Sequence, residues 1–177
     1  MKKDIFSVPI FELKVDLDKI DIAEGKYAPT WESGIPTTYQ STPKVSKSTY
    51  EYLHSIIAPC LNELKDPWKK LKFEQIWRNK YSSTDYQGYH IHPKSQWSFI
   101  IYETVSKSKT MLMNPAGHLI QNHAPRGNSM DTPLYYQPNL GPGDMILFPS
   151  WIGHQVQPGN TGTTIAGNIG IVQPPIY

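Results

Sequence analysis

From residue 73 onward the chain reads as a series of short strands, and this pattern constrains the fold more than any other feature of the sequence. Turns and loops, rather than helices, separate the apolar runs, and the 16 proline and 12 glycine residues fit such frequent turns. Strands joined in this way form an antiparallel sandwich or barrel, whereas a βαβ fold needs helices between them. The expected strands are residues 73–81, 97–103, 109–113, 144–148 and 163–172.

The chain before residue 73 has a different character. Residues 5–17 alternate well enough for an edge strand, where Pro9 is tolerated. Residues 25–44 are rich in Gly, Pro, Ser and Thr, and we expect a loop there. A helix is predicted from about residue 46 to 65, because apolar residues recur at steps of three and four, and Pro59 is expected to kink or divide it.

The length of 177 residues fits one domain with its own hydrophobic core. We expect a single domain over residues 1–177, with a strand, loop and helix in residues 1–72 and a β core in residues 73–172. Within that core, residues 114–143 are rich in Pro and Gly and predict a long loop, with a short strand at 134–137.

Composition argues against several classes of protein. The net charge of +2 is too small to indicate nucleic-acid binding, and the basic cluster of Lys69, Lys70 and Lys72 fits a solvated face. The single cysteine, Cys60, excludes a disulfide within the chain and a cysteine-based zinc site. No apolar run is long enough to span a membrane, and no secretory signal is recognisable. We therefore expect a soluble cytoplasmic protein.

Two histidines stand one residue apart in the segment Gly-Tyr-His-Ile-His-Pro. Side chains on a strand alternate between faces, so His90 and His92 project the same way, about 7 Å apart along the strand. Two imidazoles at that spacing can reach one metal ion. Such a pair alone is a weak signal, because ordinary surface or core histidines show the same pattern.

A third histidine strengthens the metal interpretation. Residues 141–158 contain a Gly-Asp turn, an apolar strand that ends at Pro149, and then His154 after a short loop. In a rolled-up sheet His154 can become a neighbour of His92, although 62 positions separate them in the sequence. Three histidines with open remaining positions suit Fe(II), Mn, Ni or Zn.

Together these segments resemble the 2-oxoglutarate/Fe(II) oxygenase family that is common in phages and marine bacteria, over roughly residues 73–170. The resemblance implies a mainly β, double-stranded β-helix (jelly-roll) fold with one or two N-terminal helices packed outside. It also implies Fe(II) at His90, His92 and His154, and oxidation of a substrate with 2-oxoglutarate. The matching residues are Trp77, Asn79, His90, His92, Pro93, Ser98, Tyr102, Gly143, Asp144, Phe148, Pro149, Ser150, Trp151, His154, Ile165, Asn168 and Ile169.

The broader cupin pattern fits in part. The spacing of Gly143, Pro149 and His154 matches its second motif, whereas Gln96 stands where its first motif usually has Glu. Gln96 is therefore either a weak fourth ligand or a residue that only packs and hydrogen-bonds. His92 occupies the place where many wider relatives of the oxygenases carry a carboxylate.

The resemblance fails at the residue expected to bind the far carboxylate of 2-oxoglutarate. The family has an Arg on the strand after the last His, because its guanidinium grips a carboxylate with two hydrogen bonds. Gly162 stands there, and no Lys or Arg follows Arg126. Lys109, at the start of a strand, is the first substitute, and Lys94 and Arg126 lie in loops that could fold over the mouth. Arg78 is expected to point outward.

Other side chains are candidates for the cofactor or the substrate. The expected inner face of the last strand is small and polar. Its Asn168 is either a ligand contact or a structural amide. We expect cofactor binding at Asn79, Tyr81, Lys109, Thr164 and Asn168, and no catalytic side chain beyond the metal ligands.

Several aromatic and histidine residues have two interpretations. Tyr81, Trp97, Tyr135 and Tyr136 line an aromatic substrate pocket or pack in the core. His54 is expected to be structural, and the loop residues His118 and His123 stay outside the metal set.

Three functions remain open on these grounds. The first is an Fe(II)/2-oxoglutarate dioxygenase that hydroxylates a small-molecule or peptidyl substrate. The second is a cupin-like metal enzyme that needs no 2-oxoglutarate, which the missing Arg favours. The third is a non-catalytic jelly-roll binding protein, which the three retained histidines argue against. No membrane or clear nucleic-acid partner is expected, and a homo-oligomer is compatible with the sequence.

Overall fold

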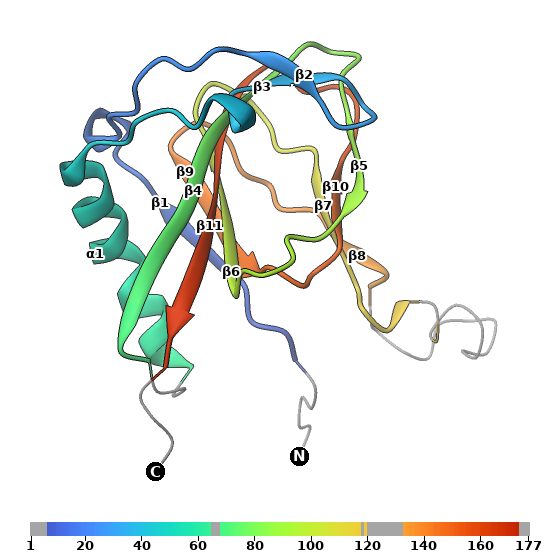
Figure 1. Cartoon of the computed structure of the whole chain (residues 1–177). Coiled ribbons are helices and arrows are strands. Elements are labelled where there is room, and N and C mark those ends of the chain that lie inside the picture. The colour runs from blue at the N-terminus through green and yellow to red at the C-terminus, as the bar shows by residue number, and fades with distance from the viewer. Residues whose placement is uncertain (1–6, 65–67, 118, 120–132, 174–177) are drawn as a thin grey trace.

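A computed structural model describes residues 7–64, 68–117, 119 and 133–173. Two antiparallel sheets face each other, as in a jelly roll (Figure 1). The first sheet contains, in spatial order, β1 (Phe11–Lys14), β9 (Asp144–Pro149), β6 (Trp97–Tyr102), β11 (Gly162–Val172), β4 (Lys70–Tyr81), β3 (Ile35–Thr37) and β2 (Ala28–Thr30). The second contains β5 (Gln87–His90), β10 (His154–Val156), β7 (Thr110–Met113) and β8 (Tyr135–Tyr136). The expected mainly β jelly-roll class is confirmed.

The first sheet is centred on the long antiparallel pair of β4 and β11. Their pairing runs from Gly162 and Tyr81 to Val172 and Lys70. Side chains alternate along β11, so Ile165 and Ile169 lie in the core under the helix, whereas Thr164 lines the interior of the roll. The inner face of this strand is small and polar at Thr164 and Asn168, as expected.

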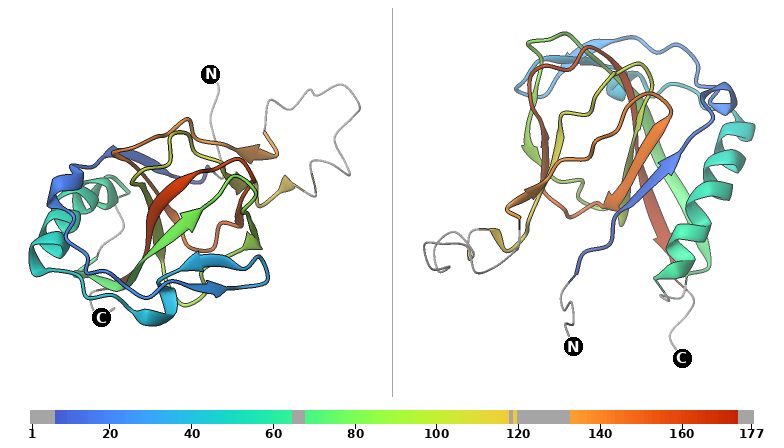
Figure 2. Two further views of the ribbon diagram at one scale, coloured as in Figure 1. Left: turned by 90° about the horizontal axis from the view of Figure 1, so that it is seen from above. Right: turned by 180° about the vertical axis from the view of Figure 1, so that it is seen from behind.

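One α-helix, α1 (Lys47–Glu63), covers the outer face of the first sheet (Figure 2). Ser46 caps it by accepting a hydrogen bond from the Thr49 N–H at 3.2 Å. Leu53 and Ile57 are fully buried in the cluster between helix and sheet. Pro59 lies inside the helix without dividing it, so of the two expected effects only a kink remains possible. Two short 3-10 helices, η1 (Leu17–Lys19) and η2 (Tyr39–Ser41), lie before α1 in the chain.

The structure corrects the prediction of a loop at residues 25–44. These residues contain β2 and β3, which form a hairpin and extend the first sheet through the pair Thr37 and Asn79. Turn-forming residues dominate this segment, and pairing to a distant strand overrides their local preference.

The other expected elements differ mainly in length. The N-terminal edge strand is β1, which pairs with β9 at the edge of the first sheet. The strand expected at 134–137 is β8, and most of the loop before it lies outside the described residues. None of the helices in the described part is long and apolar enough to cross a membrane.

Two separate hydrophobic clusters stabilise the fold. One lies between α1 and the first sheet, and the other lies between the two sheets around Tyr102, Ile146 and Phe148. The second cluster surrounds the interior cavity of the roll. Side chains around the functional site are therefore held by a core that α1 does not touch.

Candidate metal centre

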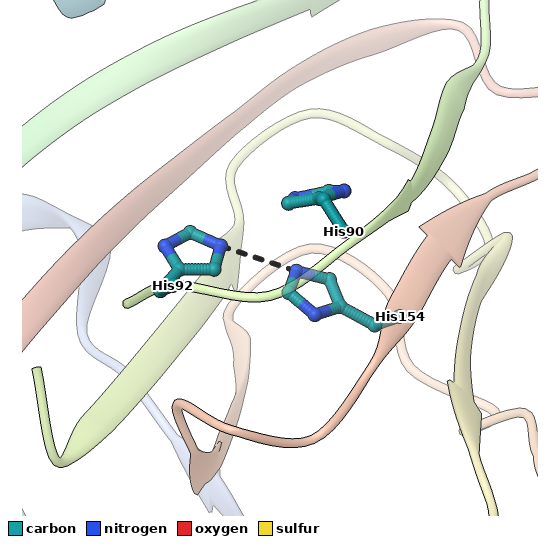
Figure 3. A group of neighbouring side chains, drawn as sticks. All are labelled: His90, His92 and His154. Carbon is teal, nitrogen blue, oxygen red and sulfur yellow. Dashed lines mark hydrogen bonds between the residues drawn. The ribbon is translucent and has the colours of Figure 1, made fainter. Parts of the chain in front are cut away.

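Three histidines converge at one end of the interior (Figure 3). His90 ends β5 and His154 begins β10, and these strands are antiparallel neighbours in which the two histidines face each other directly. His92 follows β5 by two residues, and its backbone N–H donates to the Ser150 carbonyl at 2.9 Å. The expected convergence of distant strands is therefore present.

Each imidazole is oriented by a hydrogen bond at its Nδ1 atom. His90 Nδ1 lies 2.8 Å from the Gly88 carbonyl and His154 Nδ1 lies 3.1 Å from the Ile152 carbonyl. His92 Nδ1 lies 2.7 Å from Oδ1 of Asn168. These partners are acceptors, so each Nδ1 carries the proton and each Nε2 keeps its lone pair for a metal.

The Nε2 atoms face a common point. The ligand atoms of the three histidines all lie within 4.8 Å of one another, and Nε2 of His92 is 3.2 Å from Nε2 of His154. Two unprotonated nitrogens at that distance repel unless a cation lies between them. Metal–nitrogen bonds of about 2.1 Å place two ligands roughly 3.0–3.4 Å apart. The donor set therefore fits a divalent metal ion with open positions toward the cavity.

Burial keeps the imidazoles neutral. Burial lowers the pKa of His154 well below its ordinary value, and the neighbouring His90 and His92 lower it further. Burial, followed by the proximity of His90, lowers the pKa of His92 to about 4. Trp77 stacks on His92 with ring centroids 5.9 Å apart, and Phe148 packs edge-on against His154 at 4.9 Å. Neutral imidazole is the form that binds metal.

The histidines border a cavity of about 360 Å³ inside the roll. Beside it lies an outer cleft of about 530 Å³, which runs along β5 to the tip of the β2–β3 hairpin. Trp31, Gln87, His90 and Ile91 line both spaces. The polar residues of the cavity wall, apart from the histidines and tryptophans, are Tyr39, Asn79, Tyr81, Gln87, Lys94, Ser98, Thr110, Asn160, Thr164 and Asn168.

Four of the five expected cofactor-binding residues line this cavity: Asn79, Tyr81, Thr164 and Asn168. Lys109 does not line it. The next residue, Thr110, faces the cavity from β7, and the Lys109 side chain lies outside against Gly159.

The remaining candidates lie either outside the cavity wall or outside the described residues. Arg78 points away from the cavity, as expected, and its Nε lies 3.1 Å from Glu103. Gln96 accepts a hydrogen bond from the Ile171 N–H at 2.7 Å, so it has a packing role instead of a ligand role. Trp97 is buried in the cluster under α1, and His54 is exposed on the helix. Tyr135 and Tyr136 are exposed on β8. His118, His123 and Arg126 lie outside the described residues.

Sequence reasoning missed several residues of the wall. Trp31 and Tyr39 come from the segment expected to be a loop, and Gln87 and Asn160 come from short connections and strand ends. No local pattern marks them, because the hairpin that carries Trp31 reaches the site only through sheet pairing. Asn160 follows a Gly in a turn and has no distinguishing spacing.

A family comparison now adds to this geometry. The family model described as "Putative 2OG-Fe(II) oxygenase" matches residues 75–165, just over half of the chain. The chain belongs to this 2OG-Fe(II) oxygenase family. The match spans all three histidines, so the expected resemblance is confirmed. The sequence has no significant match among curated proteins.

Several solved structures share the fold at low sequence identity. An oxidoreductase of that family from Burkholderia pseudomallei has a TM-score of 0.54 and 10% identity, covering 86% of this chain and 77% of its own. HygX from Streptomyces hygroscopicus, with nickel, 2-oxoglutarate and hygromycin B bound, has a TM-score of 0.51 and 10% identity over 92% and 82%. A viral collagen prolyl hydroxylase from Paramecium Bursaria Chlorella virus-1, as a 2-oxoglutarate complex, has a TM-score of 0.51 and 14% identity over 80% of each chain.

The site of this 2OG-Fe(II) oxygenase fits Fe(II) better than it fits 2-oxoglutarate. Three neutral imidazoles fit Fe(II). The far carboxylate of 2-oxoglutarate finds no Arg in the described cavity wall, and Lys94, at the metal end, is the one Lys there.

Proposed function

We propose that the protein is a non-haem Fe(II) oxygenase that hydroxylates an organic substrate with a 2-oxo acid as co-substrate. The observation that supports this most directly is the convergence of three Nε2 atoms, each on an imidazole anchored through Nδ1. With both groups bound, one atom of O2 enters the substrate as a hydroxyl group, and the other enters the acid formed when the 2-oxo acid loses CO2. Family membership makes 2-oxoglutarate the first co-substrate to test.

The protein's own residues bind and orient in this proposal. His90, His92 and His154 hold the metal, and Asn168 fixes the ring of His92 from behind at 2.7 Å. The described cavity wall contains no Asp or Glu. We therefore assign no catalytic side chain beyond the metal ligands.

The outer cleft is the natural place for the substrate. It adjoins His90 and is walled by the exposed aromatic side chains of Trp31, Tyr86 and Tyr89, with Glu32 beside them. Trp31 has a φ of +62°, which is costly for a residue with a large side chain, and such strain is frequent in ligand clamps. A small-molecule or peptidyl substrate would lie against these rings with its reacting carbon toward the metal.

A cupin-like metal enzyme that binds its substrate directly and uses no 2-oxo acid is the second candidate. The absence of an Arg from the described cavity wall favours it. A non-catalytic binding protein is the third, and the anchored histidines argue against it. Cytoplasmic location, a phage origin and a homo-oligomeric state remain predictions from the sequence.

Metal binding to the purified chain tests the proposal. We expect anaerobic calorimetry to show one tight Fe(II) site, which His154→Ala removes. The loss should exceed the roughly 10–100-fold typical when only a hydrogen-bond partner of a ligand is lost. His54→Ala is the matched control, because His54 lies exposed on α1. The absence of tight metal binding in the wild type would overturn the proposal.

Turnover gives the second test. The metal-loaded protein should consume O2 and convert a 2-oxo acid to CO2 and the acid one carbon shorter. Metal binding without any binding of a 2-oxo acid would move the assignment to the cupin-like alternative.

A further inference from the structure

The end of the cavity away from the metal has a composition of its own. We call it the inner end and define it by Tyr81, Thr110, Val156, Asn160 and Thr164. Strand register separates it from the metal. Along β11 the chain runs from Asn168, beside His92, to Thr164, which is four residues or about 13 Å.

The inner end is buried and uncharged. Its five residues are at most 4% exposed: Tyr81 4%, Thr110 2%, Val156 4%, Asn160 2% and Thr164 3%. Burial raises the pKa of Tyr81, so its phenol stays neutral, and the phenol donates to Gln87 Oε1 at 2.9 Å. A ligand tail that passes the histidines therefore meets hydroxyl, amide and apolar groups.

No cation of the described chain reaches this place. Lys94 lines the cavity at the metal end, two residues after His92. Arg78 is paired with Glu103 on the opposite face of β4, and Lys109 lies outside against Gly159.

The start of β11 leaves no room for a cationic side chain. Gly162 has a φ of +119°, and a Cβ there would lie 2.7 Å from Thr104 Oγ1 and 2.9 Å from the Thr104 carbonyl oxygen. Because one of these contacts is backbone, the position excludes any side chain without a shift of the strand.

To a carboxylate, the described residues of the inner end offer hydroxyl and amide groups but no cation. A carboxylate offers only acceptors, and burying it without a cation costs several kcal/mol or forces it to take up a proton.

We propose that the inner end selects a 2-oxo acid whose tail is uncharged, such as a carboxamide, over 2-oxoglutarate itself. This rests on the proposed function, because the head of the acid must bind at the three histidines. The tail amide then lies among the hydroxyl and amide groups of the inner end.

A matched pair of ligands tests the preference. N-oxalylglycine keeps the head and the far carboxylate of 2-oxoglutarate, and N-oxalylglycinamide differs only in having a primary amide in place of that carboxylate. We expect anaerobic calorimetry on the Fe(II)-loaded full chain at pH 7 to show at least tenfold tighter binding of the amide. Near-ultraviolet difference absorption of the same samples gives a second binding readout without turnover.

Two variants locate the effect. Thr164→Lys adds a cation at the inner end, and we expect it to shift the preference at least tenfold toward N-oxalylglycine. Lys94→Ala removes the cation at the metal end and should leave the ratio of the two affinities unchanged. Circular dichroism checks that both variants fold. If Thr164→Lys does not fold, the comparison of the two ligands on the wild type still tests the proposal.

The outcomes separate this inference from the proposed function. Equal or tighter binding of N-oxalylglycine to the wild type overturns the inference and leaves the oxygenase assignment intact. Binding of the metal but of neither ligand also overturns it and favours the cupin-like enzyme. Failure to bind metal removes both proposals.

Discussion

At the scale of single residues, the metal centre depends on what holds the back of each imidazole. His90 and His154 use backbone carbonyls two residues away, so their own strands orient them. His92 depends on the side chain of Asn168, 76 positions away, which in turn accepts from Ser98 Oγ at 3.1 Å. His92 is therefore the ligand whose orientation a single distant substitution can change.

Asn168→Ala removes this partner. We expect metal affinity to fall about 10–100-fold, because the ring of His92 loses the acceptor that sets its tautomer. Asn168→Asp keeps an acceptor and should recover most of the affinity. Calorimetry with Fe(II) measures both variants, and thermal unfolding of the metal-free forms shows whether the fold is intact. Unchanged affinity in Asn168→Ala would show that the ring needs no such support.

Gly162 and Gly88 form a contrasting pair of glycines. Gly162→Ala should lower the free energy of unfolding by about 1–3 kcal/mol, because its φ is +119° and its Cβ site is filled by Thr104. Gly88→Ala should change it by less than about 0.5 kcal/mol, since nothing lies within 4 Å of the added Cβ. Urea denaturation compares the two, and equal losses would contradict the argument from backbone conformation.

At the scale of elements, short strands that are distant in sequence assemble the site. β5 and β10 bring His90 and His154 face to face, and the register shifts between His154 and Val156, so the strands bend beside the metal. The β2–β3 hairpin adds Trp31 at the junction of cavity and cleft. No strand contributes more than three of the residues that line the cavity, so the site depends on how the sheets pair.

Asp144 at the start of β9 joins the turn before it to edge strand β1. Burial raises the pKa of Asp144. Hydrogen bonds from Lys14 Nζ and from the Gly141 N–H, the latter at 3.0 Å, together lower it by more, so the pKa lies below its ordinary value. A carboxyl group whose pKa is lowered by folding stabilises the fold above its unfolded pKa, and this is lost as pH falls through the folded pKa. Asp144→Asn should cost about 1–2 kcal/mol at pH 7.

The pH dependence of this variant is the sharper test. The stability difference between Asp144→Asn and wild type should be constant near neutral pH and shrink toward zero in acid. Urea denaturation at several pH values measures it, with Lys14→Met as a variant that weakens the same contact. A difference that grows in acid would contradict the direction of the shift.

At the scale of the whole molecule, the two hydrophobic clusters divide stability from function. Leu53 and Ile57 of α1 are fully buried in a cluster that includes Ile165 and Ile169 of β11. Both isoleucines point away from the cavity, although they alternate with residues that line it. Changes under the helix should therefore alter stability with little effect at the metal.

Leu53→Ala tests this division. We expect a loss of about 2–5 kcal/mol in the free energy of unfolding, because the side chain is 0% exposed and leaves a cavity. Fe(II) affinity of the folded fraction should stay within about twofold of wild type. Ser55→Ala, exposed on the same helix, is the control and should change stability by less than about 0.5 kcal/mol. A parallel loss of metal affinity would show that the clusters are coupled.

The sequence by itself determined the strand core, the covering helix and the identity of the three histidines. These rest on local signals: alternation along strands such as residues 163–172, steps of three and four along the helix, and a Gly-Asp turn that leads to His154. The family pattern lies in the same segments. The placement of Thr164 on the inner face and Arg78 on the outer face followed from the same alternation.

Only the tertiary structure decided what surrounds the metal. Strand pairing turned part of residues 25–44 into a hairpin and placed Trp31 at the cleft. Register put Thr110 in the cavity and Lys109 outside it, and the fold brought Asn168 to His92. These features depend on contacts between residues far apart in the chain, and register decides which of two neighbours faces inward. The uncharged inner end is likewise a property of four strands and the loop between β10 and β11, which no single segment of the sequence carries.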